Sequence, residues 1–288
     1  MLKLFSPAKL NLFFRVLHRR KDNFHEVASL IQAIDLGDFI TFERAEHCDT
    51  LSCSDNRLSV DSSNLILKAA EIFRRKTSLH TYLKIHLEKH IPWEAGLGGG
   101  SSNAATTLWA INKLCGSPAS MEELALWGAE IGSDVPFFFS LGTAYCTGRG
   151  EIISQQEKVP LLHPLWLVIP EKGLSTPEVF SQLKYEKFCS KDPKTLLNGF
   201  LSGFPDFIND LESAAFTIFP RLGGLKKSLY GMGFEKVLMT GSGTTLFCIG
   251  EGNFPKLFRE RVLSAYFCNR EEDHWYVETK QEEVKVFT

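Results

Sequence analysis

Residues 96–105, GLGGGSSNAA, restrict the fold of this chain more than any other segment of its sequence. Glycine loses more backbone freedom on folding than other residues, so a cluster of glycines indicates a backbone that must approach something closely. An alternating strand pattern at 81–88 precedes the segment, and an alanine-rich helical pattern at 101–114 follows it. The start of a helix offers unpaired N–H groups and a positive dipole end. The segment therefore predicts a phosphate-binding loop, with a serine-capped glycine connector as the alternative.

The common nucleotide-binding loops do not match this segment. The GxxxxGK[ST] loop requires a lysine directly before Ser101 or Ser102, and none is present there. The GxGxxG pattern fails because Ser101 or Asn103 stands where its last glycine is required. The glycine loop of protein kinases lies between strands, whereas this one opens a helix. A different class of phosphate loop is therefore expected.

The length and the proline pattern indicate two domains. A chain of 288 residues is long for one small core. Pro160 and Pro164 lie close together where one strand-and-helix pattern ends and another begins, which predicts domains over 1–157 and 158–288. A net charge of −2 gives no support for nucleic acid or an anionic membrane as partner.

The cysteines indicate a reducing compartment. There are seven, an odd number without CxxC spacing, so neither a zinc site nor a disulfide framework is expected. No secretion signal and no apolar run of membrane-spanning length is recognised in the sequence, which favours the cytoplasm. The sequence predicts strands over 9–16, 26–34, 39–43, 81–88, 165–169, 236–239, 244–249 and 274–278. Helices are predicted over 64–76, 101–114, 121–131, from about 177, and over 193–201, 206–218, 222–231 and 254–267, with a short helix at 135–136. This mixed order is typical of an α+β protein.

Three segments in order along the chain resemble the GHMP small-molecule kinases. They are the strand SPAKLNL at 6–12, the glycine segment with Pro92 before it, and LMTGSGTT at 238–245. The resemblance implies a two-domain fold with a cleft between the domains. The N-terminal domain would be like domain 2 of ribosomal protein S5, and the C-terminal domain would be ferredoxin-like. It also implies ATP as phosphate donor and Mg²⁺ as cofactor.

Further motifs are similar to one branch of this superfamily. They are DNFH at 22–25, GSDVPF at 132–137 and NDLE at 209–212. The resemblance implies a small-molecule substrate, a methylerythritol linked to cytidine diphosphate, and a place in the non-mevalonate route to isoprenoid precursors. Two departures stand out. Asn23 and Phe24 replace the usual Gly-Tyr, and Glu94 stands where glycine is common.

The resemblance assigns the catalytic roles to Asp134 and Lys9. Asp134 would accept the proton of the attacking alcohol, and Lys9 would keep that carboxylate ionised and stabilise developing negative charge. The alternatives are that Asp134 caps the short helix that follows and that Lys9 is an exposed strand lysine. Strand alternation places Lys9 and Asn11 on one face, where both can reach one pocket.

The predicted binding residues fall into two groups. The resemblance assigns the cytidine end to Phe24 and His25, with Thr176 and Phe180 covering the base, and Asn11 is included with the substrate contacts. A structural histidine, a helix-start threonine and a core phenylalanine are the alternatives. For ATP we expect backbone groups of the loop and a flanking wall, comprising Pro92, Gly96, Leu97, Gly98, Gly99, Gly100, Ser101, Ser102, Asn64, Leu65 and Lys89. Ser102, or its neighbour Ser101, is expected to approach Mg²⁺.

Two other functions stay open at this point. Another alcohol kinase of the superfamily, acting on homoserine or mevalonate, would carry the same glycine loop. A ligand sensor without catalysis would tolerate loss of Lys9 or Asp134, yet both are present. The chain is expected to act as a monomer or weak homodimer.

Overall fold

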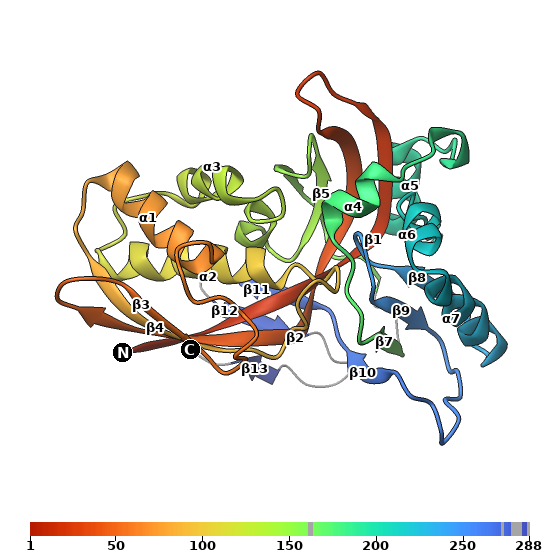
Figure 1. The fold of residues 1–288 in the computed structure, drawn as a ribbon. Coiled ribbons are helices and arrows are strands. Elements are labelled where there is room, and N and C mark those ends of the chain that lie inside the picture. Colours follow the sequence, from red (N-terminus) through yellow and green to blue (C-terminus); the bar gives the residue numbers. More distant parts are fainter. Residues whose placement is uncertain (161–163, 272–273, 278–283, 287–288) are drawn as a thin grey trace.

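The computed structural model describes residues 1–160, 164–271, 274–277 and 284–286. Two long strands form its centre, β1 (Leu2–Arg19) and β2 (His25–Ala45), which pair antiparallel. Figure 1 shows them running from the part that carries α1 to α3 into the part that carries α5 to α7. The strands predicted over 26–34 and 39–43 are parts of β2. Gly37 permits the continuation, because a Cβ there would lie 2.2 Å from the ring of Phe5.

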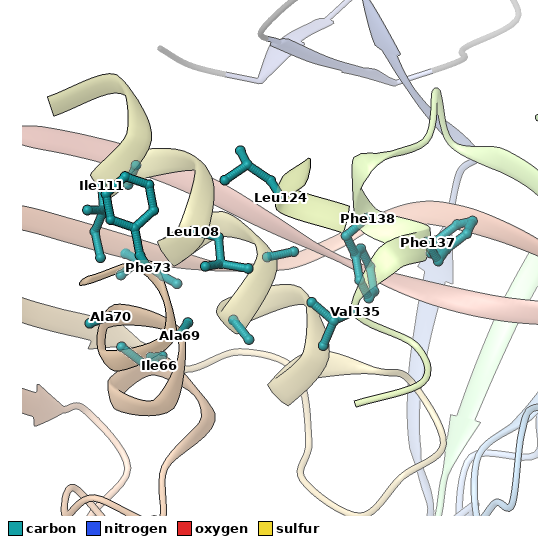
Figure 2. Packing of buried hydrophobic residues seen from close by; sticks show 14 of the residues in the cluster. Ile66, Ala69, Ala70, Phe73, Leu108, Ile111, Leu124, Val135, Phe137 and Phe138 are labelled. Carbon is teal, nitrogen blue, oxygen red and sulfur yellow. The ribbon is translucent and has the colours of Figure 1, made fainter. Parts of the chain in front are cut away.

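The N-terminal body is a sheet covered by helices. Its strands β3 (Thr50–Cys53), β4 (Tyr82–Glu88), β5 (Thr143–Thr147) and β6 (Ile152–Gln155) stand in the order β3-β4-β2-β5-β6, with β1 on β2. Helices α1 (Leu65–Thr77), α2 (Gly99–Leu114) and α3 (Met121–Ile131) cover the sheet, followed by the short 3₁₀ helix η1 (Pro136–Phe139). Figure 2 shows the apolar stripes of the helices meeting, with Phe73 of α1 against Ile111 and Leu108 of α2. The strands β3, β5 and β6 were not predicted from the sequence.

The C-terminal body contains an antiparallel sheet in the order β10-β7-β9-β8. Its strands are β7 (Leu165–Ile169), β8 (Lys236–Met239), β9 (Leu246–Ile249) and β10 (Arg261–Ala265). The helices are α4 (Thr176–Ser181), η2 (Tyr185–Lys187), α5 (Pro193–Leu201), α6 (Glu212–Ile218) and α7 (Pro220–Gly231). The predicted α+β class is confirmed.

The helix predicted over 254–267 is wrong. Residues 261–265 form β10, which pairs with β7 from Arg261 opposite Ile169 to Ala265 opposite Leu165. An edge of the sheet was available there, and ladder hydrogen bonds outweighed the weak helical spacing of the segment. The helix predicted over 206–218 begins only at Glu212, because residues 208–210 instead bond to β1.

The end of the chain returns to the N-terminal body. Strands β11 (Cys268–Glu271), β12 (His274–Val277) and β13 (Val284–Val286) form a small sheet. Cys268 is buried in the N-terminal core, and its carbonyl oxygen accepts a hydrogen bond from Gln32 on β2. Residue 278 of the last predicted strand and residues 161–163 of the predicted boundary lie outside the described residues. No helix in the described part of the chain has the length and hydropathy of a membrane span.

Candidate active site

A cavity of about 1270 Å³ is lined by residues of both bodies. Its lining includes Lys9 of β1, the glycine segment before α2, Asp134 from the α3–η1 connection, α4, and Gly241 from the β8–β9 turn. Segments far apart in the sequence thus meet around one space. The predicted residues that line it are Lys9, Phe24, His25, Asn64, Leu65, Lys89, Pro92, Gly96, Leu97, Gly98, Gly99, Gly100, Ser101, Asp134, Thr176 and Phe180.

The glycine segment leaves the start of α2 open. Helix α2 begins at Gly99, two residues before its predicted start, and no side chain of the described residues caps it. Gly98 precedes the helix with φ +70°, and Gly96 has φ +76°. A Cβ at Gly96 would lie 2.2 Å from the carbonyl oxygen of Thr240, so the β8–β9 turn packs directly on the loop. No acidic residue stands in the first turn of α2 either. This geometry suits an anionic ligand at the helix start.

Lys9 and Asp134 come together at the edge of the cavity. Lys9 Nζ lies 3.4 Å from Asp134 Oδ2, with the lysine side chain 4% exposed and the aspartate 36% exposed. Backbone N–H of Lys9 donates to Leu97 O, which ties β1 to the glycine loop. The carboxylate is therefore open to a ligand, while its cationic partner is fixed from behind.

Asp134 is not the cap of the following helix. The residue at the N-cap of η1 is Val135, and no side chain among the described residues caps that helix. The capping alternative is therefore excluded. Cys146 of β5 lies below the pair, and burial, together with the Asp134 charge, raises the pKa of its thiol far above its ordinary value. Cys146 stays a neutral thiol in this wall.

Asn11 lies beneath Lys9 and does not line the cavity. Lys9 Nζ donates to Asn11 Oδ1 at 2.5 Å, and Asn11 Nδ2 donates to Ser29 Oγ at 2.8 Å. Asn11 N–H donates to Thr240 Oγ1 at 2.9 Å. These bonds use both ends of the Asn11 amide, so in this geometry the side chain serves Lys9 rather than a ligand.

A second buried group stands behind the loop. Lys89 Nζ pairs with Asp38 Oδ2 at 2.5 Å, and Asp38 Oδ1 accepts the backbone N–H groups of His90 and Ile91. Burial lowers the pKa of Lys89, although the Asp38 charge opposes this. A Cβ at Gly99 would lie 3.0 Å from Lys89 Nζ. Lys89 thus adds a cation beside the start of α2.

Ser101 and Ser102 differ in what they face. Ser101 lines the cavity, whereas Ser102 is buried with its hydroxyl 2.8 Å from that of Ser6. Asn103 Nδ2 donates to the same Ser6 hydroxyl. The Mg²⁺ contact expected at Ser102 therefore does not fit this geometry, while Ser101 is accessible.

The wall beside the loop is partly apolar. Asn64 Oδ1 caps α1 by accepting from Ile66 N–H, so the amide oxygen is already used. Leu65 faces Gly100, where a Cβ would lie 3.4 Å from Leu65 Cδ1. Trp93, which sequence analysis did not select, is half-exposed on the lining with Arg57 6.0 Å from its ring centre. A tryptophan directly after the loop's proline was the available signal.

Aromatic rings gather at the other end of the cavity. The His25 ring lies 5.0 Å from that of Phe180 and 6.3 Å from that of Tyr185, centre to centre. Burial, followed by the positive Arg19, lowers the pKa of His25, so its imidazole is neutral at pH 7. Phe24 is 53% exposed. These rings form a surface suited to a planar base.

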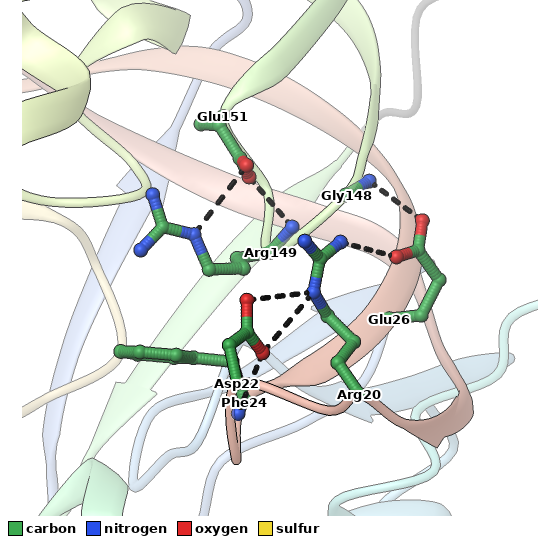
Figure 3. Close-up of polar contacts among 7 residues, drawn as sticks. All are labelled: Arg20, Asp22, Phe24, Glu26, Gly148, Arg149 and Glu151. Atoms are coloured by element: carbon green, nitrogen blue, oxygen red, sulfur yellow. Dashed lines mark hydrogen bonds and ion pairs between the residues drawn. The ribbon is translucent and has the colours of Figure 1, made fainter.

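Arg149 was missed by sequence analysis and lies over Phe24. Its guanidinium carbon is 5.0 Å from the ring centre, a cation–π distance. Its backbone N–H and Nε donate to Glu151, as Figure 3 shows. Figure 3 also shows Arg20 bonded to Asp22 and Glu26, which holds the turn that carries Phe24. An arginine between two glycines, in TGRGE, was the sequence signal.

Both departures from the family pattern occupy left-handed backbone. Asn23 has φ +68° and Glu94 has φ +52°. Asparagine adopts this region more readily than most residues, which explains how it replaces glycine at position 23. The backbone of Glu94 is strained, because glutamate rarely adopts this left-handed region. The Glu94 carbonyl oxygen accepts a hydrogen bond from Leu174 N–H.

Comparison with known proteins identifies the family of the chain. Residues 64–142 match the family model of the GHMP kinases N terminal domain. A curated relative, 4-diphosphocytidyl-2-C-methyl-D-erythritol kinase of Protochlamydia amoebophila (strain UWE25), is 52% identical over 278 residues, covering 96% of this chain and 93% of the relative. The chain belongs to the 4-diphosphocytidyl-2-C-methyl-D-erythritol kinase family. It is an ATP-dependent small-molecule kinase of the GHMP superfamily.

Other members of this kinase family are also similar to the chain. The chloroplastic enzyme of that name from Arabidopsis thaliana is 43% identical and covers 96% of this chain and 76% of its own length. A crystal structure of 4-(cytidine 5'-diphospho)-2C-methyl-D-erythritol kinase has a TM-score of 0.73 and 32% identity, covering 87% of this chain and 91% of that one. A mevalonate kinase structure, at 14% identity and TM-score 0.68, shares the fold.

Proposed function

We propose that this chain transfers the γ-phosphoryl group of ATP to the 2-hydroxyl of 4-diphosphocytidyl-2-C-methyl-D-erythritol, in the non-mevalonate route to isoprenoid precursors. One observation carries the proposal. The Lys9–Asp134 pair, 3.4 Å apart, lies in one cavity with an uncapped helix start and an aromatic surface. The names of the relatives at 52% and 43% identity support this acceptor.

In this mechanism Asp134 is the base. The acceptor hydroxyl approaches its exposed carboxylate, and the oxygen attacks the γ-phosphorus while the bond to ADP breaks. The hydroxyl proton passes to Asp134. Lys9, at 3.4 Å, pairs with that carboxylate and offsets negative charge that develops on the transferring group.

The glycine segment and its surroundings would hold ATP. Open N–H groups at the start of α2 receive the phosphates, and Lys89 adds positive charge from behind. Leu65, Pro92 and Trp93 supply the wall for the nucleoside.

Mg²⁺ would enter with the nucleotide. Among the described residues no cluster of three acidic, histidine or cysteine side chains could hold a metal. Magnesium commonly keeps several waters and binds through phosphates, which fits a site where protein supplies a single hydroxyl. Ser101 is the accessible hydroxyl, and it replaces Ser102 in this proposal. The ion would neutralise phosphate charge.

The aromatic end would receive the cytidine diphosphate. Phe24 and Phe180 offer ring faces to the cytosine, and neutral His25 offers a hydrogen-bonding edge. Thr176 is fixed by its hydroxyl contact of 2.8 Å with Ser242, which ties α4 to the β8–β9 turn. Arg149, beside Phe24, adds positive charge for the phosphates.

The proposal also covers the oligomeric state, the compartment and the partners of the enzyme. We expect a monomer or weak homodimer in the cytoplasm, without nucleic acid or membrane partners. All seven cysteines are free thiols, as expected in a reducing compartment. The net charge of −2 gives no attraction to nucleic acid.

The test is ATP consumption by the purified protein with Mg²⁺ and, separately, the diphosphocytidyl acceptor, homoserine or mevalonate. We expect turnover with the first acceptor alone. Asp134→Asn should lower kcat by about 10²- to 10⁴-fold, the typical contribution of a positioned base. Asp206→Asn, which removes an exposed carboxylate paired with Lys191, is the matched control and should leave kcat unchanged. Turnover with homoserine or mevalonate would contradict the acceptor assignment, and nucleotide binding without turnover would favour the sensor.

A further inference from the structure

Thr240 stands at the end of β8, in the C-terminal body, yet its hydroxyl contacts β1. Thr240 Oγ1 accepts a hydrogen bond from the backbone N–H of Asn11 at 2.9 Å. The same hydroxyl donates to Asn11 Oδ1 at 3.4 Å. The threonine is fully buried. Thr240 does not line the cavity, so the proposed function leaves its side chain without a role.

The hydrogen bonds around Asn11 have a fixed direction. The ammonium of Lys9 can only donate, so the Asn11 atom at 2.5 Å must be the amide oxygen. Asn11 Nδ2 then faces Ser29 Oγ at 2.8 Å, and Ser29 donates its own proton to Phe13 O at 2.6 Å. The Ser29 hydroxyl is thereby an acceptor toward Asn11. Thr240 favours the same orientation of the Asn11 amide, because the Thr240 hydroxyl proton points to Asn11 Oδ1.

Burial makes the orientation of the Asn11 amide costly to change. Asn11, Ser29 and Thr240 are all buried, and Asn11 and Thr240 do not line the cavity, so water is not at hand to replace a partner that Asn11 loses to Thr240. If the Asn11 amide rotated by half a turn, its NH₂ group would face the Lys9 ammonium and its oxygen would face Ser29. Two donors would then oppose each other in a low-dielectric site, which is costly.

The same turn also holds the phosphate loop. Thr245 N–H donates to Ala95 O at 3.2 Å, and the carbonyl oxygen of Thr240 packs against Gly96. A Cβ at Gly241 would lie 3.2 Å from Lys9 Nζ. The C-terminal turn is therefore in contact with both the lysine and the loop that would hold ATP.

We propose that Thr240 and Ser29 are positioning residues for phosphoryl transfer. They fix the Asn11 amide so that its oxygen holds Lys9 opposite Asp134. The position of a catalytic group in the N-terminal body then depends on a hydroxyl from the C-terminal body. This inference rests on the proposed function, in which Lys9 is catalytic.

The experiment compares three threonine variants. Thr240→Val keeps the shape and removes the hydroxyl, whereas Thr240→Ser keeps the hydroxyl. Thr107→Val is the matched control, because the buried Thr107 hydroxyl bonds a carbonyl of its own helix, α2, and Thr107 does not line the cavity. We expect Thr240→Val to lower kcat roughly 10-fold, the scale of a hydrogen bond to a charged network, with both KM values unchanged. Thr240→Ser should restore most of kcat, and Thr107→Val should match the parent.

Ser29→Ala and a structural measurement complete the test. Ser29→Ala should reproduce the loss in kcat, and the double variant with Thr240→Val should lose less than the product of the two effects. In a crystal structure of Thr240→Val, Lys9 Nζ should be displaced from Asp134. A kcat equal to the parent in Thr240→Val, an equal loss in Thr107→Val, or an undisplaced Lys9 would overturn the inference. The displacement is measured without substrate, so failure of the acceptor assignment, seen in the parent enzyme, is separate.

Discussion

The two ends of the cavity are built differently. At the reaction end, Lys9, Asn11 and Lys89 are almost fully buried, and each has a hydrogen-bonded or charged partner within 2.5 Å. At the aromatic end, Phe24 and Tyr185 are largely exposed, and ring contacts of 5 to 6.3 Å hold the group together. One end is a closed polar network, and the other is an open apolar surface.

The difference indicates where substitution is tolerated. A buried polar group that loses its partner bears its full desolvation cost, whereas a half-exposed ring loses only part of its contact area. The replacement of Gly-Tyr by Asn23 and Phe24 falls at the open end. The segments that carry Lys9, Asp134 and the loop glycines of the closed end resemble the family motifs.

Among the tests of this comparison, the largest effect should come from Gly98→Ala at the closed end. A Cβ at Gly98 would lie 2.9 Å from Lys9 Cγ, and the φ of +70° costs a non-glycine residue about 1–2 kcal/mol. We expect kcat to fall about 100-fold, with loss of unfolding free energy measured in urea. Gly224→Ala on α7 is the control, since its Cβ meets nothing within 4 Å. Activity unchanged in Gly98→Ala would mean that the closed end is not rigid.

A smaller effect should come from Phe24→Ala at the open end. Removing the ring takes away stacking surface for a base, so KM for the diphosphocytidyl acceptor should rise about 10-fold, as for one base–aromatic stack. KM for ATP and kcat should change little. Phe204→Ala, which removes an exposed ring outside the cavity lining, is the control for steady-state kinetics. A fall in kcat without a change in acceptor KM would place Phe24 in the closed network instead.

The smallest effect should be the pH dependence of stability that His25 contributes. Its pKa in the folded protein lies below the ordinary 6.5, because of burial and then Arg19. As the pH falls below about 6.5, the unfolded chain binds a proton that the folded chain does not, so this contribution destabilises the folded state. Urea unfolding at pH 7.5 and 5.5 should show a smaller stability loss for His25→Gln than for the parent. The control is His47→Gln at an exposed position, and its loss of unfolding free energy between the two pH values should equal that of the parent. A larger loss in His25→Gln than in the parent would contradict the predicted sign.

The family motifs could be located from the sequence because they are local. The glycine segment, the strand that carries Lys9 and the loop that carries Asp134 each occupy a few adjacent residues. The missed residues, Arg149 and Trp93, have weak local signals that do not indicate their partners. Arg149 reaches Phe24 only because the β5–β6 turn lies beside the β1–β2 turn, and Trp93 lines the cavity only through the path of the chain before α2. Their roles remain predictions.

The sequence by itself determined the helix that follows the glycine segment, the strand that carries Lys9 and the α+β class, since each depends on backbone preferences and spacing within a short segment. Only the tertiary structure decided three other features. It turned residues 261–265 into an edge strand, it faced Ser102 toward Ser6 rather than the cavity, and it brought Thr240 to Asn11. Each depends on a partner far away in the chain, and burial makes the resulting hydrogen bonds obligatory.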